Sequence, residues 1–470
     1  MFEFLRYVLD ELKNSFALAL LAGVAALMLL SITYAVHKYR YKGEKRYPWG
    51  KALLWILFAG YMSIVLYATI LRGMGGYREW NLHLFRAWRE AWNNFSAKNW
   101  ANVLLNVAMF GPLGFLLPLL GKRFRKWYLT VPAGFGISLI IELLQLAIGR
   151  GICDVDDLFC NTLGASIGYF VIMTILSIIC FKRNHVKPVL IYGSLTLISV
   201  MAICSIFIVY QVKEYGNLPY AAAYANNTKG TVWRLECQLP AAEGEAPVYK
   251  TQTRSIDECD AFAEAFKKIV GTEYTTISYY QEAAYYMDQA GDENGAHFLF
   301  LSYLDPGYEY SSRPGDDPVW CDTDRETVEA ALSRFPVFIP SYSEFVTEGN
   351  GWHTFTVDKH VDGAVMVNGR LRCRYAADGT IRELENKLLS YTYHDVEAII
   401  SPEVAYKHLC NGRFYDEGYF ESKKPSEVSV LSCTLEYEID TKGFYQPVYY
   451  FDMVSRDGSY ADRVMIPAMQ

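Results

Sequence analysis

The feature that most constrains this chain is a series of apolar stretches, each long enough to cross a lipid bilayer. A helix rises about 1.5 Å per residue, so roughly 20 mostly apolar residues span the ~30 Å hydrocarbon core. The first half of the chain holds six such stretches, at approximately Ser15–Val36, Lys51–Leu71, Ala101–Leu120, Trp127–Ile148, Thr162–Phe181 and Val189–Tyr210. The sequence therefore predicts an all-α transmembrane bundle of about six helices.

Charge is divided unevenly between the two halves of the chain. Residues 1–215 carry 22 Lys and Arg against 11 Asp and Glu, whereas residues 216–470 carry 22 against 40. A basic, apolar half followed by an acidic, polar half indicates two environments. The acidic half would repel nucleic acid and anionic lipid head groups, so we expect the bilayer and no nucleic acid as partners.

The basic residues between the spans predict the orientation. Connections 34–51, 122–126 and 182–187 are rich in Lys and Arg and lie on one side if the spans alternate, which the positive-inside rule makes cytoplasmic. The loop at 72–99 is also basic, but it is longer and includes Glu79 and Glu90. We therefore expect a multi-pass protein of the cell membrane with an extracellular C-terminal domain.

Polar residues inside the third span carry more information than the leucines around them, because burying them in lipid is unfavourable. Asn99, Asn102 and Asn106 recur at helical spacing and share one face. A helix-packing stripe would explain the same pattern. The run from Phe110 to Phe115 contains Gly111, Pro112 and Gly114 and is expected to interrupt or kink the helix.

The fourth span ends in a concentration of ionisable residues. Glu142 and Gln145 share a helical face, and a carboxylate inside a span is by default a functional hypothesis with a partner to be named. Arg150 is the expected partner, with a structural pin of the loop as the alternative. Together with the asparagines these residues form a predicted polar rim that consists of Asn102, Asn106, Glu142, Gln145, Arg150, Asp154, Asp157 and Asn161.

The fifth span begins with small residues at helical spacing. Gly164 and Gly168 form a small-xxx-small face, which allows a second helix to approach closely. We therefore assign these two glycines, with Gly111, Pro112 and Gly114, to helix packing.

These motifs in this order resemble the VanZ-like family. The resemblance covers about Ile64–Met173 and rests on Asn106, Phe110-x-Pro112-x-Gly114, Glu142-x-x-Gln145, Arg150, Asp154, Asp157, Asn161, Gly164 and Gly168. Members of this family are small bacterial membrane proteins, and the founding type is associated with resistance to glycopeptide antibiotics such as teicoplanin. The resemblance implies a context in the cell envelope and no particular reaction. An added first span and a large C-terminal half set this chain apart from small members.

The second half reads as an α+β domain of two lobes. Capping signatures predict helices at Cys259–Val270, Val328–Phe335 and from Ser401 to Asn411-Gly412, and alternation predicts a strand at Thr231–Leu239. A hairpin is expected at Val365–Tyr375 and Ile381–Tyr391, then a meander of Val428–Glu438, Gln446–Val454 and Ala461–Ile466. The predicted domains are 1–50 (first span and basic loop), 51–181 (VanZ-like), 182–215 (last span), 216–345 (lobe 1) and 346–470 (lobe 2).

The last part of the chain weakly resembles extracytoplasmic modules of the YycI/YycH and PepSY-like kind. The resemblance covers about Gly363–Gln470 and rests on the stretches 400–414 and 443–449. Such modules bind ligands or regulate partners in the envelope. The resemblance therefore implies a binding or regulatory role for this half.

No catalytic constellation is evident in the sequence. The histidines of the second half are not in H-E-x-x-H spacing, and there is no G-x-S-x-G or Walker motif. Its six cysteines lack metal-type spacing and leave disulfides open. We expect no cofactor and no resident metal, and the sequence favours a protein that is not an enzyme. Hard divalent cations favour clustered carboxylates, but Arg150 already neutralises one at the rim.

Three classes of function remain open at this point. The first is a non-enzymatic envelope protein that binds a polar ligand, such as a glycopeptide or a lipid-linked cell-wall precursor, at the outer rim. The second is an extracytoplasmic sensor or regulator that acts through a membrane protein partner. The third is a metal-dependent enzyme or transporter of lipid-linked precursors.

Overall fold

The computed structural model describes residues 27–41, 47–71, 77–180, 186–241, 244–280, 283–289, 296–313, 318–416 and 418–469. The chain divides into two compact units, residues 1–214 and 215–470, which we call the membrane unit and the C-terminal domain. Each unit is described by itself.

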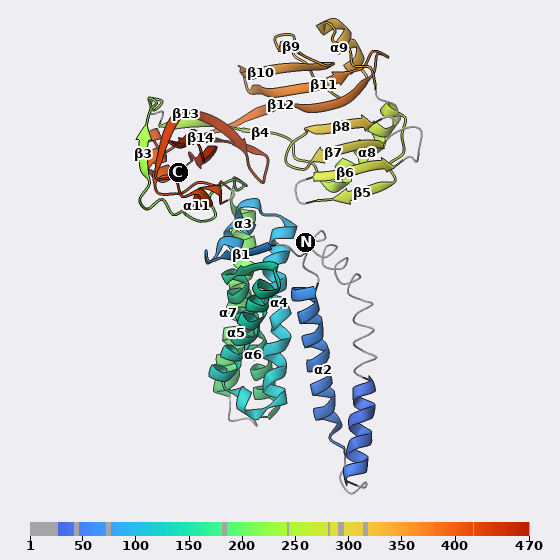
Figure 1. The fold of residues 1–470 in the computed structure, drawn as a ribbon, viewed down its shortest axis with the longest axis vertical. Coiled ribbons are helices and arrows are strands. Elements are labelled where there is room, and N and C mark those ends of the chain that lie inside the picture. The colour runs from blue at the N-terminus through green and yellow to red at the C-terminus, as the bar shows by residue number, and fades with distance from the viewer. Residues whose placement is uncertain are drawn as a thin grey trace. The chain divides into compact units, whose positions relative to one another are not determined.

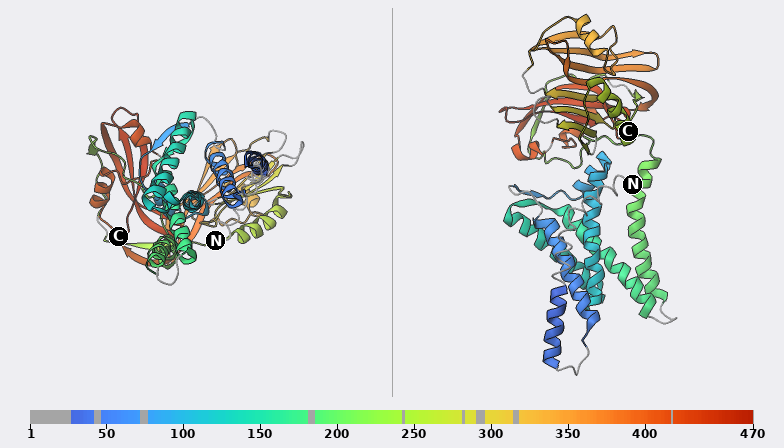
Figure 2. Two further views of the ribbon diagram at one scale, coloured as in Figure 1. Left: turned by 90° about the horizontal axis from the view of Figure 1, so that it is seen from below. Right: turned by 90° about the vertical axis from the view of Figure 1, so that its right-hand side faces the viewer.

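The membrane unit is a set of long apolar helices with a short two-stranded sheet (Figures 1 and 2). Five described helices are long and apolar enough to span a membrane, over Trp49–Thr69, Ala97–Leu120, Trp127–Ile148, Val155–Ile179 and Val186–Val212. The prediction of a transmembrane bundle is therefore confirmed. The predicted first span lies mostly outside the described residues, and residues 27–41 at its end are helical. The elements are α2 (Trp49–Leu66), η1 (Tyr67–Leu71), β1 (Tyr77–Asn81), α3 (Arg86–Asn94), α4 (Ala97–Leu120), η2 (Lys122–Arg125), α5 (Trp127–Ile148), β2 (Arg150–Asp154), α6 (Val155–Cys180) and α7 (Val186–Val212).

The glycine-proline run in the third predicted span does not interrupt its helix. Helix α4 is continuous from Ala97 to Leu120 and contains both Pro112 and Pro118. The expected interruption is therefore wrong. Packing by neighbouring helices compensates for the missing donor of a proline inside a membrane helix, so the helix continues.

Helices α4 and α6 pack with their backbones in close approach. A Cβ atom on Gly164 would overlap the carbonyl oxygen of Val107, and one on Gly168 would overlap that of Gly111. Gly114 faces the backbone of Ala165 in the same way, whereas a Cβ on Gly111 would meet nothing within 4 Å. The crossing thus depends on three glycines whose side-chain positions are occupied by backbone of the other helix.

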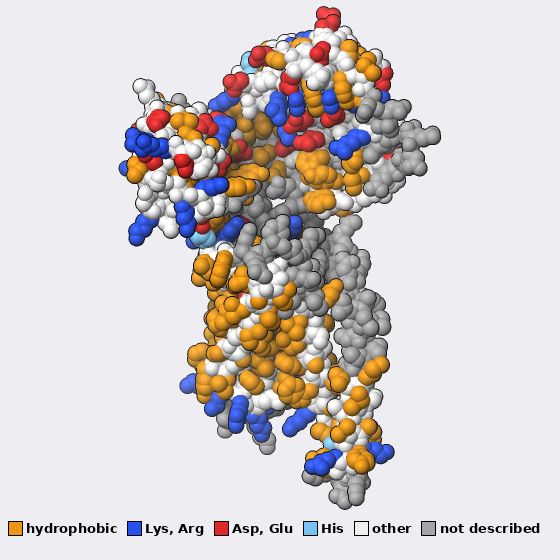
Figure 3. Space-filling view, in the orientation of Figure 1, with side chains coloured by type: hydrophobic (Ala, Val, Ile, Leu, Met, Phe, Trp, Pro, Cys, Tyr) orange, Lys and Arg blue, Asp and Glu red, His pale blue; other side chains and the backbone are white. Residues whose placement is uncertain are grey.

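The two ends of the membrane unit carry different features. Helix η2 between α4 and α5 consists of Lys122, Arg123, Phe124 and Arg125, and Figure 3 shows Lys and Arg gathered below the apolar sides of the helices. At the other end of α4, Phe95 stacks on Tyr210 of α7 with ring centroids 3.3 Å apart. The end of α7 therefore lies beside the junction of α3 and α4.

The C-terminal domain is built on a 13-stranded sheet with four helices among its described residues. The predicted α+β domain after a membrane bundle is confirmed. The strands are β3 (Val232–Leu235), β4 (Glu245–Lys250), β5 (Thr276–Tyr279), β6 (Ala283–Gln289), β7 (Ala296–Ser302), β8 (Tyr308–Arg313), β9 (Glu344–Gly349), β10 (Trp352–Asp362), β11 (Val365–Tyr375), β12 (Ile381–Ala398), β13 (Glu427–Ile439), β14 (Phe444–Ser455) and β15 (Ala461–Pro467), and the helices are α8 (Ile256–Val270), α9 (Arg325–Leu332), α10 (Pro402–Cys410) and α11 (Tyr419–Lys423).

The predicted helices and the predicted hairpin and meander of this domain are found in the structure, and one helix, α9, is shifted along the sequence. Ser255 and Glu258 form the predicted capping box of α8, and the side chain of Ser401 caps α10 by accepting from Val404 N. The hairpin β11–β12 and the meander β13–β14–β15 pair antiparallel as predicted. Helix α9 begins at Arg325, three residues before the predicted start at Val328, because the Asp324 carboxylate caps it by accepting from Thr327 N.

The two largest of four buried cores contain most of the buried apolar side chains of the domain. One combines α8, α9 and strands β6–β8 with β10, β11 and the first part of β12, around Phe266, Tyr308 and Phe355. The other combines Ala246 of β4 with residues between Ile399 and Ala468. Residues 215–230, at the start of this domain, pack partly against the rest of it. Gly216 N donates to Asp440 Oδ2 (2.6 Å) and Asn226 N to Gly412 O (2.8 Å).

Candidate functional site

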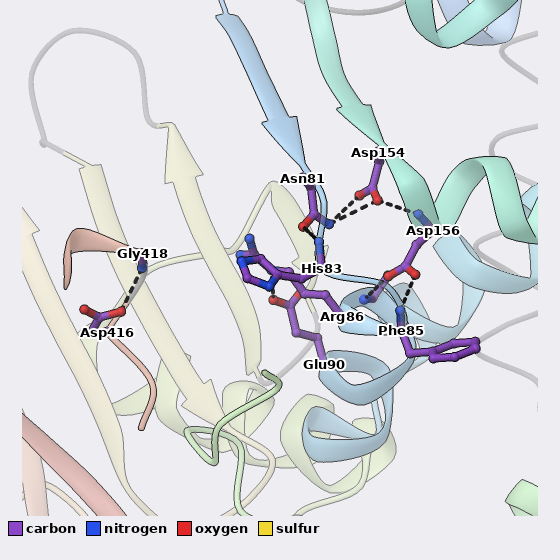
Figure 4. Close-up of polar contacts among 10 residues, drawn as sticks. Asn81, His83, Phe85, Arg86, Glu90, Asp154, Asp156, Asp416 and Gly418 are labelled. Carbon is purple, nitrogen blue, oxygen red and sulfur yellow. Dashed lines mark hydrogen bonds and ion pairs between the residues drawn. The ribbon is translucent and has the colours of Figure 1, made fainter. Parts of the chain in front are cut away.

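The candidate site lies where two short parallel strands join three helices of the membrane unit. Strand β1 precedes α3, and β2 connects α5 to α6. The two strands pair in parallel, with Tyr77 opposite Arg150 and Asn81 opposite Asp154. This pairing brings residues that are about seventy positions apart in the chain to the same end of the bundle (Figure 4).

Asp154 at the end of β2 is held by an asparagine that the sequence analysis did not select. Asn81 Nδ2 lies 3.0 Å from each carboxylate oxygen of Asp154, and Asn81 is 7% exposed. Asp154 Oδ1 also accepts from Asp156 N (2.8 Å), which closes the turn into α6. No spacing motif in the sequence links Asn81 to the rim, since the link arises from strand pairing.

Asp156 has a structural role at the start of α3. Its buried carboxylate accepts hydrogen bonds from Phe85 N (2.5 Å) and Ala87 N (2.7 Å) (Figure 4). Helix α3 lacks a side-chain cap of its own at Phe85, which has a left-handed φ of 67°. Asp156 therefore satisfies amide groups that the first turn of a helix leaves unpaired.

Glu142 and Asp157 complete a group of carboxylates with Asp154. Glu142 on α5 is 3% exposed and accepts from Asp154 N at 3.0 Å. Asp157 Oδ1 accepts from Asn106 Nδ2 on α4. Asp154 and Asp157 lie close enough to Glu142 to repel it electrostatically. We call Glu142, Asp154 and Asp157 the carboxylate cluster.

The negative charge of this cluster is not balanced by any described cation. Among the side chains that the structure describes, no lysine or arginine forms an ion pair with Glu142, Asp154 or Asp157. The side chain of Arg150, the expected partner, lies outside the described residues, although its backbone is part of β2. Buried carboxylates without a cation favour a proton, a cationic group or a ligand rich in hydrogen-bond donors.

One helical turn deeper, two more polar residues join α5 and α6. Asn161 Nδ2 donates to Ser138 Oγ at 2.9 Å, and the two side chains are 2% and 0% exposed. Asn161 Oδ1 has no donor among the described residues. Gln145 points elsewhere, since its Nε2 donates to the carbonyl of Thr69 in the π turn η1 (2.8 Å).

The structure thus brings together part of the predicted polar rim. Asn106, Glu142, Asp154 and Asp157 meet, and Asn161 lies one turn along α6 from Asp157. Asn102 is exposed and makes no contact with the cluster in the described structure. It lies one turn nearer the start of α4 than Asn106, on an exposed face, while its neighbours Ala101 and Val103 are buried.

Two further observations limit the chemistry of this site. The described residues include no group of three His, Cys, Asp or Glu side chains with an arrangement that could hold a metal ion. Burial, reinforced by the charges of Glu142 and Asp154, raises the pKa of the Cys153 thiol above its ordinary value. Cys153 is therefore a protonated thiol at neutral pH and a poor nucleophile.

The helices that build this site match a known family. Residues 49–182 match the sequence model of the VanZ/LLP1 family. These residues form a VanZ/LLP1 domain. The resemblance inferred from the motifs between residues 64 and 173 is confirmed, and the domain extends to the start of α2 and past the end of α6.

The other comparisons add little. No curated protein matches the chain. Among solved structures, the chain is similar to the C-terminal domain of YpeB from Bacillus megaterium, with 13% sequence identity over 47% of this chain and 99% of that one and a TM-score of 0.14. A similarity at that score carries no weight for fold or function.

Proposed function

We propose that this chain is a VanZ-like envelope protein whose carboxylate cluster binds a polar, donor-rich ligand at the outer surface of the membrane and thereby lowers the access of teicoplanin-type glycopeptides to their target. The observation that carries the proposal is Glu142, a carboxylate 3% exposed within a span and held by Asp154 N at 3.0 Å. Holding a carboxylate there is unfavourable, and the carboxylates that do occur in membrane spans usually have a function. The VanZ/LLP1 domain supports the envelope context.

The distribution of charge supports an outward-facing cluster. The basic helix η2 lies at the end of α4 opposite to the start of that helix, near which Asn106 and the cluster lie. By the positive-inside rule the η2 end is cytoplasmic, which directs the cluster outward. Because the end of α7 lies beside the α3–α4 junction, the chain leaves the membrane on that same outer side. The C-terminal domain is then extracellular.

The ligand is expected to provide N–H or O–H donors, because the cluster offers mainly acceptor oxygens. Glycopeptides and the head groups of lipid-linked precursors both have such donors. A cationic group would also be favoured, since Glu142 and Asp157 repel each other in a medium of low dielectric constant. The geometry assigns no bond-breaking step to these residues.

Replacing Glu142 by glutamine tests this proposal. Glu142→Gln keeps the size of the side chain and removes its charge, so the teicoplanin concentration that inhibits growth should fall several-fold in a strain that depends on this gene. Glu90→Gln in α3 is the matched control, since Glu90 pairs with Arg86 outside the cluster. Unchanged resistance in Glu142→Gln at equal protein level in the membrane would contradict the proposal.

A further inference from the structure

Strand β12 of the C-terminal domain has a gap in its pairing along one edge. Its first edge pairs with β11 from Ile381 to Thr392. Its second edge pairs with β8 through Glu383–Asn386 and with β4 through Thr392–Ala398 (Figure 1). Among the described residues, no strand pairs with 387–391 on that second edge. At about 3.4 Å per residue, these five residues leave about 17 Å of strand edge open.

The backbone groups of Leu388 and Ser390 point into this gap. The carbonyl of Ser390 accepts from Thr251 Oγ1 (3.4 Å), a residue that follows β4 on the second edge. Backbone groups alternate between the two edges of an antiparallel strand, so Leu388 is directed the same way as Ser390. The gap therefore presents two N–H groups and the C=O of Leu388, together with the C=O of Ser390, which already accepts one long hydrogen bond from Thr251 Oγ1.

A cleft lies next to the gap. Its volume is about 1010 Å³, and Leu388, Leu389 and Ser390 of β12 line it. The segment Lys250–Arg254 also lines it, as do Pro306, Pro336 and Phe338. Small-molecule sites commonly have volumes of roughly 300–1,000 Å³, so this cleft can hold a segment of several residues.

The side chains of the cleft indicate the chemistry of its occupant. Lys250, Arg254 and His394 line it against one acidic residue, Glu258. Asn386, which is only 6% exposed, also lines it. The basic side chains favour a carboxylate.

We propose that this cleft binds an extended peptide segment that carries a carboxylate. The peptide adds a short strand to β12 between β8 and β4, with its main chain paired to Leu388 and Ser390 and its carboxylate beside Lys250. Strand addition to an exposed edge is a common mode of peptide recognition, in which the main chain gives affinity and the side-chain pockets give specificity. This site is distinct from the carboxylate cluster and does not depend on the function proposed above.

The test uses the full chain in detergent micelles and a fluorescein-labelled hexapeptide library with free carboxyl termini. We expect binders with Kd below about 1 mM. The best binder is then synthesised again with an N-methyl group on each residue in turn. Methylation at the paired residues removes a donor and adds bulk, so affinity should fall at least tenfold at alternate positions only. Binding should also slow hydrogen exchange at Leu388 and Ser390.

Charge variants of the protein complete the test. Lys250→Glu should weaken binding of the same peptide by roughly tenfold, because it places a like charge beside the carboxylate. Lys268→Glu, at an exposed position of α8 away from the cleft, is the matched control and should leave affinity within about twofold. The proposal is overturned if no library member binds, if methylation at every position leaves affinity unchanged, or if exchange at Leu388 and Ser390 is unaffected.

Discussion

The membrane unit and the C-terminal domain are packed through different kinds of residue. In the membrane unit, α4 and α6 meet through Gly114, Gly164 and Gly168, where backbone contacts backbone. In the C-terminal domain, large aromatic side chains such as Tyr286, Phe355 and Phe451 are fully buried between strands and helices. Lipid provides no hydrophobic driving force between helices, so close contact must stabilise the bundle, whereas water drives apolar side chains into the cores of the domain.

Polar groups are also distributed differently in the membrane unit and in the C-terminal domain. In the membrane unit the carboxylates and their polar partners gather at one end, where Asn81 and Glu142 both bind Asp154. In the domain they occur throughout the sheet, and buried carboxylates there hold loops. Asp440 accepts from Lys442 N and Phe444 N at 2.7 and 2.9 Å, and burial raises its pKa above the ordinary value. A polar residue is therefore more informative about function in the membrane unit than in the domain.

The difference in packing between the membrane unit and the C-terminal domain would be tested most strongly by replacing a buried phenylalanine with alanine in each. Phe355 in β10 and Phe110 in α4 are both 0% exposed. Phe355→Ala should lower the free energy of unfolding of the domain by about 3–5 kcal/mol, the sum of lost transfer energy and a cavity. Phe110→Ala should reduce bundle stability by less, because only packing is lost. Urea titration of the full chain monitors the domain, and titration with sodium dodecyl sulfate monitors the bundle.

Phe338→Ala is the control for this pair, since that side chain is 60% exposed. Its loss should change stability by no more than about 0.5 kcal/mol. An equal loss for Phe110→Ala and Phe355→Ala would contradict the difference in driving force.

A smaller loss of stability is expected when the glycine contacts of the bundle are altered. Gly164→Ala adds one methyl group where the carbonyl of Val107 already lies, and overpacking of this kind costs about 1–3 kcal/mol. Gly111→Ala adds the same group into open space on α4 and should be nearly neutral. Thermal unfolding of the two variants in identical micelles gives the difference. If both variants unfold at the same temperature, the α4–α6 crossing does not depend on glycine.

The smallest expected effect is a pH dependence confined to the C-terminal domain. Burial lowers the pKa of His297 below its ordinary value of 6.5. The unfolded chain therefore binds a proton more readily than the folded one, and stability declines as pH falls from about 6.5 through the lowered pKa. His297→Gln should reduce this slope in urea titrations between pH 7 and 5.

His360→Gln is the matched control for the histidine, because His360 is exposed on β10. It should leave the slope as in the parent protein. A slope that responds equally to both substitutions would assign the effect to something other than burial of His297.

Much of the local structure could be predicted from the sequence because its causes are local. The apolar runs predict the spans, and Ser255 with Glu258 predicts the start of α8. The turn at Asp378-Gly379 fixes the hairpin β11–β12, since Gly379 has a φ of 86°. The small-residue spacing of Gly164 and Gly168 indicated a close helix contact, and Glu142 stood out because carboxylates are rare in spans.

Other features depend on contacts between distant parts of the chain and could not be predicted. Asn81 meets Asp154 only because β1 and β2 pair in parallel. Most buried apolar residues between 345 and 388 share a core with residues 259–335, whereas Met366 packs with Tyr437 of the meander, and this grouping comes from the order of strands in the sheet. Asn102 has the spacing of a rim residue, yet it lies on an exposed face of α4 while its neighbours Ala101 and Val103 are buried.

By itself, the sequence determined that a membrane bundle precedes an acidic α+β domain, because length, hydropathy and charge act on each segment independently of the rest. The tertiary structure decided which spans meet and which partners the carboxylates have. It also decided where β12 is left unpaired, because pairing, burial and hydrogen bonding join residues far apart in the chain.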